Sequence, residues 1–386
     1  MMDNAGRRTA RVGGALYFAY YSGAASLIPF LSLYLRQSGL AGGQIGLLVA
    51  VPPVMIFLGA GLWGVAADRA AGPSSVFRLT TLCSVAAALL IPVPGTVAVL
   101  AIVIAVYALG QSGIVPLLDS LVLNGLGDEA WRYGRIRLWG AVGWGSAAAG
   151  VGVIIDAFGL ATVFFVYAGF LLLAVGISFL LPRPRGSSGA QRSAGAVGKL
   201  LRVRGFPSLL VLCVAEGIVF GVLANYLFIH LQAVGASGTL LGLMLTAATA
   251  SEVGFFLITP RLLRRFPAHR LIVLAVGVMV VRLLLYIPLD SGGPALAIQL
   301  LHGPGFALFI AAAVNRAGQL APAGTAATAQ GAVTATNFGL GAALGAVGGG
   351  ALLEIAGTRT ILASAAGVAF LLLLGVLVHG RIRRSE

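Results

Sequence analysis

Ionisable side chains inside long apolar stretches are the clearest candidates for chemistry in this sequence. Asp119 and Arg137 lie in consecutive apolar stretches, equally far from a turn near residue 128. A charge at mid-depth in a membrane is costly unless it is paired or hydrated, so each such residue is a functional candidate. The equal spacing predicts that the two side chains lie at one depth and can pair. We expect them to contact substrate, with a structural ion pair as the alternative.

A second group of ionisable residues occurs later in the chain. Glu252 and Arg282 are equally far from a turn near residue 267, and Arg282 and His302 are equally far from a turn near residue 292. Three helices with ionisable residues therefore meet at one depth. A carboxylate removed from water beside a guanidinium is poised to exchange a proton, so we predict a proton-coupling site. An inert polar clamp is the alternative.

For the remaining candidate residues, the sequence does not identify an interaction partner. Glu216 lies about as deep in its apolar stretch as Glu252 does, and we include it among the proton-coupling residues. Tyr17, Tyr20 and Tyr21 either line a cavity or pack in the core, and of these we expect Tyr20 to contact substrate.

The two cysteines do not indicate a metal site. Cys83 and Cys213 lie far apart, without Cys or His at metal-ligand spacing. We expect two buried, unpaired thiols.

The composition indicates which elements position these residues. The chain is 59% hydrophobic and 9% charged, whereas a soluble domain carries roughly 25% charged residues. About 20 apolar residues cross a bilayer, so the chain is expected to be an all-α membrane protein. We predict twelve transmembrane helices, at 12–35, 44–67, 75–93, 96–124, 133–156, 160–181, 208–233, 238–261, 271–289, 295–317, 326–354 and 358–380.

The positions of the basic residues predict the orientation. The chain has 25 Lys and Arg, 11 Asp and Glu and a net charge of +14, and the charges lie between apolar stretches and form no patch for nucleic acid. If the N-terminus is cytoplasmic, Arg36 and Arg359 fall outside, Arg282 lies within a helix, and the other basic residues fall inside. We therefore predict cytoplasmic termini and a multi-pass protein of the inner membrane, basic toward anionic lipid.

The two halves of the sequence resemble each other at a nearly constant offset. Each half has an even number of predicted spans, so both enter the membrane in the same direction as parallel repeats. We predict a six-helix bundle at 1–181, a cytoplasmic linker at 182–207, a second six-helix bundle at 208–386, and a monomer. The matched residues are Leu31, Leu35, Gly39, Gly42, Gly46 and Leu47 with Leu227, Leu231, Gly235, Gly238, Gly242 and Leu243, and Gly143, Gly150, Gly152, Asp156 and Gly159 with Gly341, Gly348, Gly350, Glu354 and Gly357.

One run in the first half resembles the major facilitator superfamily. The run PLLDSLVLNGLGDEAWRYGRIRLWGAVGW is similar to lactose permeases and, more closely, to the 3-phenylpropionate permease branch. The resemblance implies that Asp119 corresponds to the sugar-binding carboxylate of lactose permease and Arg137 to its helix-5 arginine. It also implies that Trp144 stacks on a ring of the substrate. The expected fold is the major facilitator fold, with a midplane site between two rocking halves.

The second half carries the same resemblance. The runs SEVGFFLITPRLLRRFPAHR, MVVRLLLY and LLHGPGF place Glu252, Arg282 and His302 on the helix-8 glutamate, helix-9 arginine and helix-10 histidine of these relatives. One departure is Gly305, where lactose permease has a helix-10 glutamate. The resemblance therefore leaves Glu252 or Glu216 as the proton carrier.

A signature between the second and third spans suggests a gate. The run GLWGVAADRAAGP resembles the loop signature of the superfamily, with Asp68 and Arg69 as the gating charges. Helix 5 contains no proline and so lacks the Gly-Pro pattern typical of drug-exporting relatives, which weighs against antiport.

The sequence lacks the motifs of ATP-driven pumps and of common hydrolases. It contains no Walker lysine motif, HExxH or GxSxG, so we expect no enzyme activity and no cofactor. We predict a proton-coupled symporter for a small organic solute, with a proton-driven exporter of drugs or metabolites as the alternative. Trp144 favours a sugar or nucleoside, whereas the arginines and the closer branch favour an aromatic carboxylate.

Overall fold

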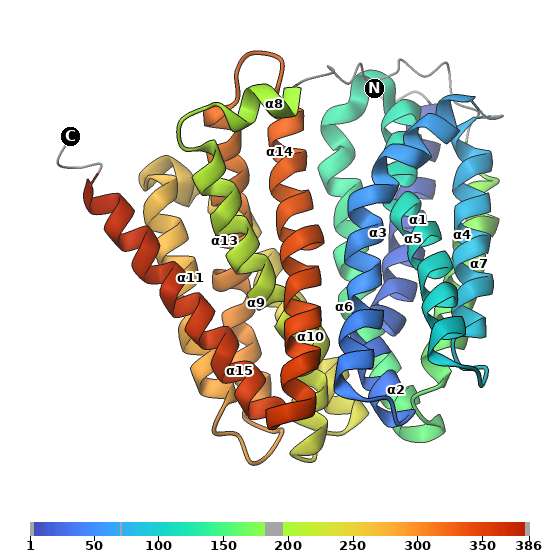
Figure 1. Ribbon diagram of the computed structural model, residues 1–386. Coiled ribbons are helices and arrows are strands. Elements are labelled where there is room, and N and C mark those ends of the chain that lie inside the picture. Colours follow the sequence, from blue (N-terminus) through green and yellow to red (C-terminus); the bar gives the residue numbers. More distant parts are fainter. Residues whose placement is uncertain (1–3, 70–71, 182–195, 383–386) are drawn as a thin grey trace.

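The computed structural model describes residues 4–69, 72–181 and 196–382, and the regular structure in these ranges is helical (Figure 1). The first half contains α1 (Asn4–Leu27), α2 (Leu31–Gln37), α3 (Gly42–Arg69), α4 (Pro73–Leu90), α5 (Val97–Leu126), α6 (Tyr133–Phe158) and α7 (Thr162–Ser178). The second half contains α8 (Ala196–Leu201), α9 (Phe206–Ala233), α10 (Gly238–Arg265), α11 (Ala268–Tyr286), α12 (Ala295–Ile298), α13 (His302–Leu320), α14 (Ala326–Thr334) and α15 (Ala342–Ile382). Short 3-10 segments occupy Ile28–Phe30, Gly127–Arg132 and Gln299–Leu301, and a π-helical segment, Ala335–Gly341, joins α14 to α15.

The helices are long and apolar enough for a multi-pass membrane protein. Nine segments of the described ranges qualify as candidate spans, and Gly42–Ile56 and Thr162–Ser178 are shorter apolar helices. The last candidate, Ala326–Val378, bends at Gly357, where φ is 75°. Every predicted span overlaps one of these helical segments, and the count of twelve stays a prediction.

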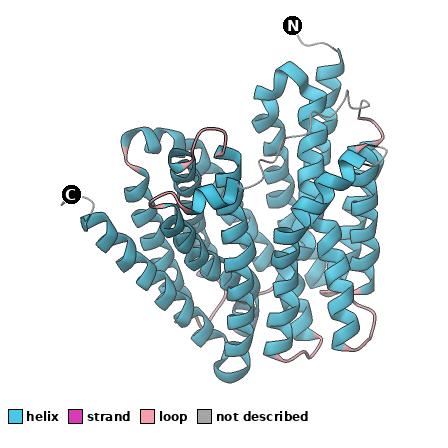
Figure 2. Ribbon diagram, turned by 45° about the horizontal axis from the view of Figure 1, so that its top comes forward, coloured by secondary structure: helices cyan, strands magenta, loops and turns pink. Residues whose placement is uncertain are grey.

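The helices form two groups that lie side by side (Figures 1 and 2). In the first, α1 packs on α6 and α7, and α5 on α3 and α4; in the second, α9 packs on α15, and α13 on α10 and α11. The groups meet along α6 with α10 and along α3 with α15. Of the predicted linker, residues 182–195 lie outside the described part, and α8 shows that the remainder is partly helical.

Glycines of the predicted repeat have matching conformations. Gly39 and Gly235 have φ values of 84° and 85°, and Gly159 and Gly357 have 86° and 75°. Glycine adopts this left-handed region without the steric cost that other residues pay. Helices of both halves therefore turn at equivalent positions, as the sequence match predicts.

One of the two cysteines differs from its prediction. Cys213 is buried on α9, as expected, but Cys83 on α4 is exposed, so the prediction of two buried thiols is wrong for Cys83. The lipid-facing side of a membrane helix is as apolar as its packed side. An apolar neighbourhood in the sequence therefore did not indicate burial inside the protein.

Candidate functional site

The first cluster surrounds an ion pair between α5 and α6. Arg137 Nη1 lies 2.9 Å from Asp119 Oδ1, which confirms the predicted proximity. The Tyr17 hydroxyl on α1 donates to the same oxygen at 2.5 Å, and Arg137 donates to the hydroxyls of Tyr21 and Tyr133 at 3.2 and 3.3 Å. The Arg137 side chain is 39% exposed and that of Asp119 28%. The pair is thus oriented by tyrosines and remains partly exposed.

The two other predicted substrate residues lie nearby on the same helices. Trp144 follows Arg137 by about two turns of α6 and so shares its side of the helix, and it is partly buried against the core. Tyr20 is 5% exposed and packs edge-on against Tyr21, with ring centroids 4.9 Å apart. The tyrosines that touch the ion pair are therefore its neighbours Tyr17 and Tyr21, and substrate contact by Tyr20 stays a prediction.

The second cluster joins α10, α11 and α13. Glu252 Oε2 lies 3.4 Å from His302 Nε2, and His302 Nδ1 lies 3.1 Å from Arg282 Nη1. Arg282 Nη2 and the Tyr286 hydroxyl both donate to Gln299 Oε1, each at 2.6 Å. Arg282 is 3% exposed, whereas the Glu252 side chain is 30% exposed. The predicted meeting of three helices is confirmed, with the carboxylate at its accessible end.

The contacts of His302 fit one neutral form of the imidazole. A guanidinium only donates hydrogen bonds, so His302 Nδ1 must accept from Arg282 and the ring proton must lie on Nε2. That proton then points at Glu252. A second proton on His302 would place N–H against N–H at Arg282. Of the two facing side chains, Glu252 is the more accessible, at 30% exposed against 17% for His302.

Three phenyl rings extend the second cluster. Phe306 stacks on His302 with ring centroids 5.0 Å apart. It also contacts Phe220 on α9 and Phe338 in the π-helical segment, at centroid distances of 5.7 and 6.0 Å. All three rings are partly buried. These three rings could not be predicted from the sequence, because phenylalanines in apolar helices carry no distinguishing signal.

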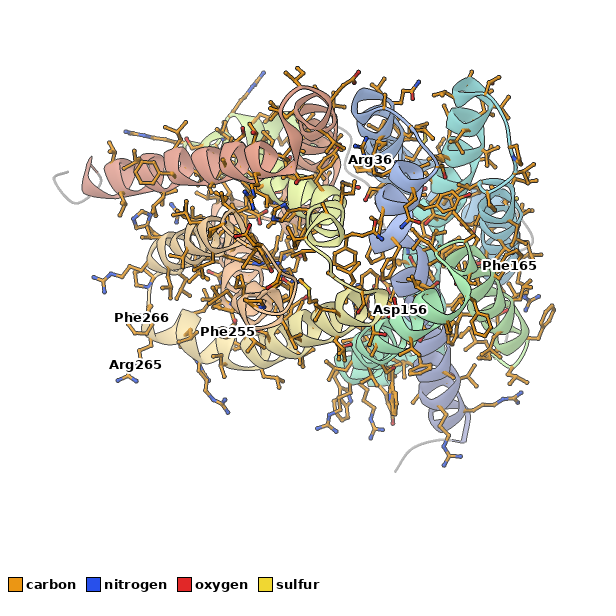
Figure 3. All side chains as sticks on the ribbon, turned by 90° about the horizontal axis from the view of Figure 1, so that it is seen from below. Arg36, Asp156, Phe165, Phe255, Arg265 and Phe266 are labelled. Carbon is orange, nitrogen blue, oxygen red and sulfur yellow. The ribbon has the colours of Figure 1, made fainter. Side chains whose placement is uncertain are left out.

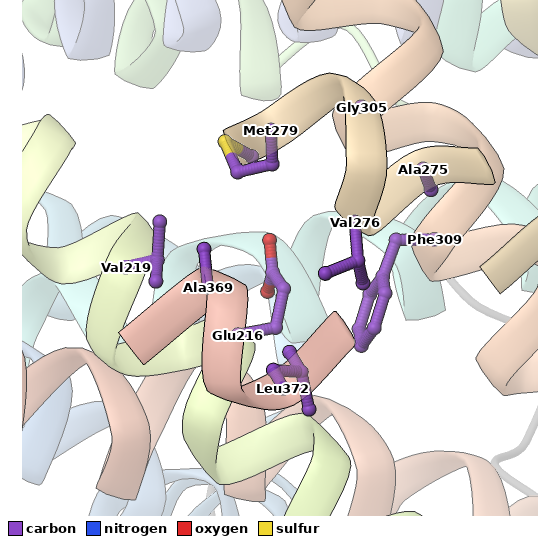
Figure 4. A pocket seen from close by; sticks show the side chains of 9 residues that line it. All are labelled: Glu216, Val219, Ala275, Val276, Met279, Gly305, Phe309, Ala369 and Leu372. Carbon is purple, nitrogen blue, oxygen red and sulfur yellow. The ribbon is translucent and has the colours of Figure 1, made fainter. Parts of the chain in front are cut away.

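Glu216 lies in a separate, buried position on α9. Its Oε2 accepts a hydrogen bond from Asn337 Nδ2 of the π-helical segment, and its Oε1 has no hydrogen-bond partner among the described residues. Figure 4 shows the carboxyl group in a small apolar cavity. The cavity measures about 10 Å³, the lower limit for one water molecule. Its lining includes Gly305 of α13.

Two buried amides, Gln299 and Asn337, were not predicted from the sequence. Gln299 accepts the bonds from Arg282 and Tyr286, and Asn337 is the partner of Glu216. The available signal was an amide within an apolar stretch close to an ionisable residue. Asp68 and Arg69 belong to α3, but their side chains lie outside the described part of the structure, so the gate stays a prediction.

The sequence of this chain is similar to known transporters along most of its length. The MFS_1 like family matches residues 14–363. A maltose permease of Geobacillus stearothermophilus is 32% identical over 347 residues, which cover 88% of this chain and 86% of that protein. A probable 3-phenylpropionic acid transporter of Escherichia coli (strain K12) is 28% identical over 278 residues, or 69% and 71% of the two chains.

Solved structures share the fold at low sequence identity. The crystal structure of a mutant of the nucleoside transporter NupG matches with a TM-score of 0.87 and 17% identity, covering 96% of this chain and 99% of that one. The POT family transporter PepTSo matches with a TM-score of 0.73 and 13% identity, over 100% and 99% of the chains.

Proposed function

Because the chain belongs to the MFS_1-like family of the major facilitator superfamily, we propose that this membrane transporter is a proton-coupled symporter that imports a small organic solute. One observation carries the proposal. The partly exposed Glu252 faces a neutral histidine that is held by a buried arginine, an arrangement suited to taking up and releasing a proton. The Asp119–Arg137 pair, in the other half, is available for the solute.

The proposed architecture has twelve spans in two parallel bundles, residues 1–181 and 208–386, joined by the cytoplasmic linker 182–207. Both termini lie in the cytoplasm, the protein is a monomer, and the membrane is the inner membrane. The distribution of basic residues supports this orientation. Figure 1 is consistent with it, because α8 and the C-terminal end of α15 lie at the same end of the molecule, opposite α2.

The proposed cycle follows alternating access. A proton binds Glu252 and the solute binds between Asp119, Arg137 and Trp144 while the site faces outward. Protonation removes the negative charge that faces His302, so the loaded protein favours reorientation and releases both inside. A ligand shifts such an equilibrium only by its differential affinity for the two states. Glu216 assists as a second buried acid, and Asp68 and Arg69 gate the cytoplasmic side.

Two solute classes fit the site. Trp144 and the 32% identical maltose permease favour a sugar or nucleoside-like ring. An aromatic carboxylate is favoured by Arg137 and by the three phenylalanine rings at Phe220, Phe306 and Phe338. The similarity to the probable 3-phenylpropionic acid transporter favours the same class. Both classes present a ring for stacking and oxygen atoms for charged hydrogen bonds.

Accumulation in proteoliposomes tests the proposal and identifies the class. Vesicles with an alkaline interior and an acidic exterior are offered radiolabelled maltose, uridine and 3-phenylpropionate in turn. The symporter accumulates one of them above equilibrium, and a protonophore abolishes the accumulation. Accumulation only under the reversed pH gradient would instead indicate a proton-driven exporter, and equal uptake with or without a gradient would exclude proton coupling.

A further inference from the structure

Asp156 joins the two halves at the end of the molecule opposite α8. It lies near the end of α6 and accepts the backbone N–H groups of Gly238 and Thr239, each at 2.7 Å, and the Thr239 hydroxyl at 2.6 Å. Gly238 and Thr239 begin α10, which belongs to the other half. The first N–H groups of a helix have no partner within it and carry the positive end of its dipole. Asp156 therefore caps a helix of the opposite half (Figure 3).

Glu354 makes the equivalent contact in the opposite direction. It lies in α15, just before the bend at Gly357, and its Oε2 accepts the N–H of Gly43, the second residue of α3, at 3.0 Å. In the sequence repeat Asp156 corresponds to Glu354, and Gly42 to Gly238. Each half thus supplies one acid and receives one cap at the same end.

The helix backbones approach closely beside these two acids. A side chain at Gly238 would overlap Gly152 and Asp156, and one at Gly42 would overlap the backbone of Gly350 and Glu354. The caps therefore hold together a tightly closed contact. Both acids are themselves exposed, so water can replace their bonds when the contact opens.

We propose that Asp156 and Glu354 are positioning residues of the transport cycle, two symmetry-related helix caps that keep this end of the molecule closed. The proposal rests on the alternating access proposed above. A cap within one half would persist through the cycle. These caps must break, because donor and acceptor belong to halves that separate. Each therefore favours the closed state by about fivefold, the ratio that a typical helix cap provides.

Electron–electron distance measurements between spin labels test this assignment. Labels are placed at Ser38 and Ser291, which are exposed, lie in different halves and flank the closed end, in the full-length C83S/C213A protein. We expect Asp156→Ala and Glu354→Ala each to raise the long-distance population about fivefold and the double variant to raise it about 25-fold. Asp156→Asn retains an acceptor oxygen and should restore most of the short-distance population.

A matched control separates this effect from a general loss of surface charge. Asp290 lies at the same end and pairs with Arg359 of its own half at 2.5 Å, so Asp290→Ala should leave the distances unchanged. Unchanged distances in the folded single variants, or an equal shift in Asp290→Ala, would overturn the assignment. The measurement requires neither solute nor proton gradient. A failure of proton coupling would therefore leave the proposal of the two caps intact. A failure of the two caps would likewise leave proton coupling intact.

Discussion

At the residue scale, the Asp119–Arg137 pair raises the question of whether it binds solute or only locks two helices. Its partial exposure and the hydrogen bonds from Tyr17 and Tyr21 fit a preorganised binding group. A pure lock would tolerate removal of both charges together, whereas a binding group would not.

A double-mutant cycle distinguishes these roles. Asp119→Asn and Arg137→Gln should each lower kcat/KM for uptake by about tenfold or more, since a hydrogen bond to a charged group contributes about 1.5–3 kcal/mol. The double variant should be no better than the worse single variant. Recovery of transport in the double variant would identify a structural ion pair.

Gln299 gives a prediction about stability. It accepts hydrogen bonds from Arg282 and Tyr286, and it is 3% exposed. Gln299→Leu would leave two buried donors without a partner, so we expect the free energy of unfolding to fall by about 1–3 kcal/mol. Thermal unfolding in detergent measures this change. Gln299→Glu, which keeps the acceptor, is the control and should unfold closer to the wild type.

The sequence predicted the charged members of both clusters because helical hairpins convert equal spacing from a turn into equal depth. It could not predict which of Tyr17, Tyr20 and Tyr21 faces the ion pair, since the rotation of α1 is set by packing against α6 and α7. Gln299 and Asn337 were missed because uncharged amides in apolar helices are less costly than charges and give a weaker signal.

At the element scale, the π-helical segment Ala335–Gly341 is the least predictable part of the fold. It has no distinctive composition, and π-helical turns often occur at functional sites. Here the segment directs Asn337 toward Glu216 and Phe338 toward Phe306. The long helices, by contrast, were predictable from apolar length and from the breaks at glycine, proline and charge.

Glu216 and Gly305 line one cavity from two different helices. Glu216→Gln keeps the size of the side chain and removes its titratable proton, so we expect proton-driven accumulation to fall about tenfold or more while solute exchange persists. Glu216→Ala combined with Gly305→Glu moves the acid across the cavity and should restore part of the accumulation. Wild-type accumulation in Glu216→Gln would remove this residue from the coupling mechanism.

At the scale of the whole molecule, the proposed orientation rests on the distribution of basic residues. We expect a cysteine at Ser38 to react with a membrane-impermeant maleimide in intact cells, in the C83S/C213A background. A cysteine at Ser187, in the predicted linker, should react only after the cells are permeabilised. The opposite labelling pattern would invert the proposed topology.

In the proposed symport, solute and proton enter together, and Glu252 carries the proton. External pH in weakly buffered, de-energised cells that express the protein tests it most directly, with the solute added as a pulse. We expect alkalinisation that depends on the solute and is absent in Glu252→Gln, which still exchanges solute. Acidification, or alkalinisation that persists unchanged in Glu252→Gln, would contradict it.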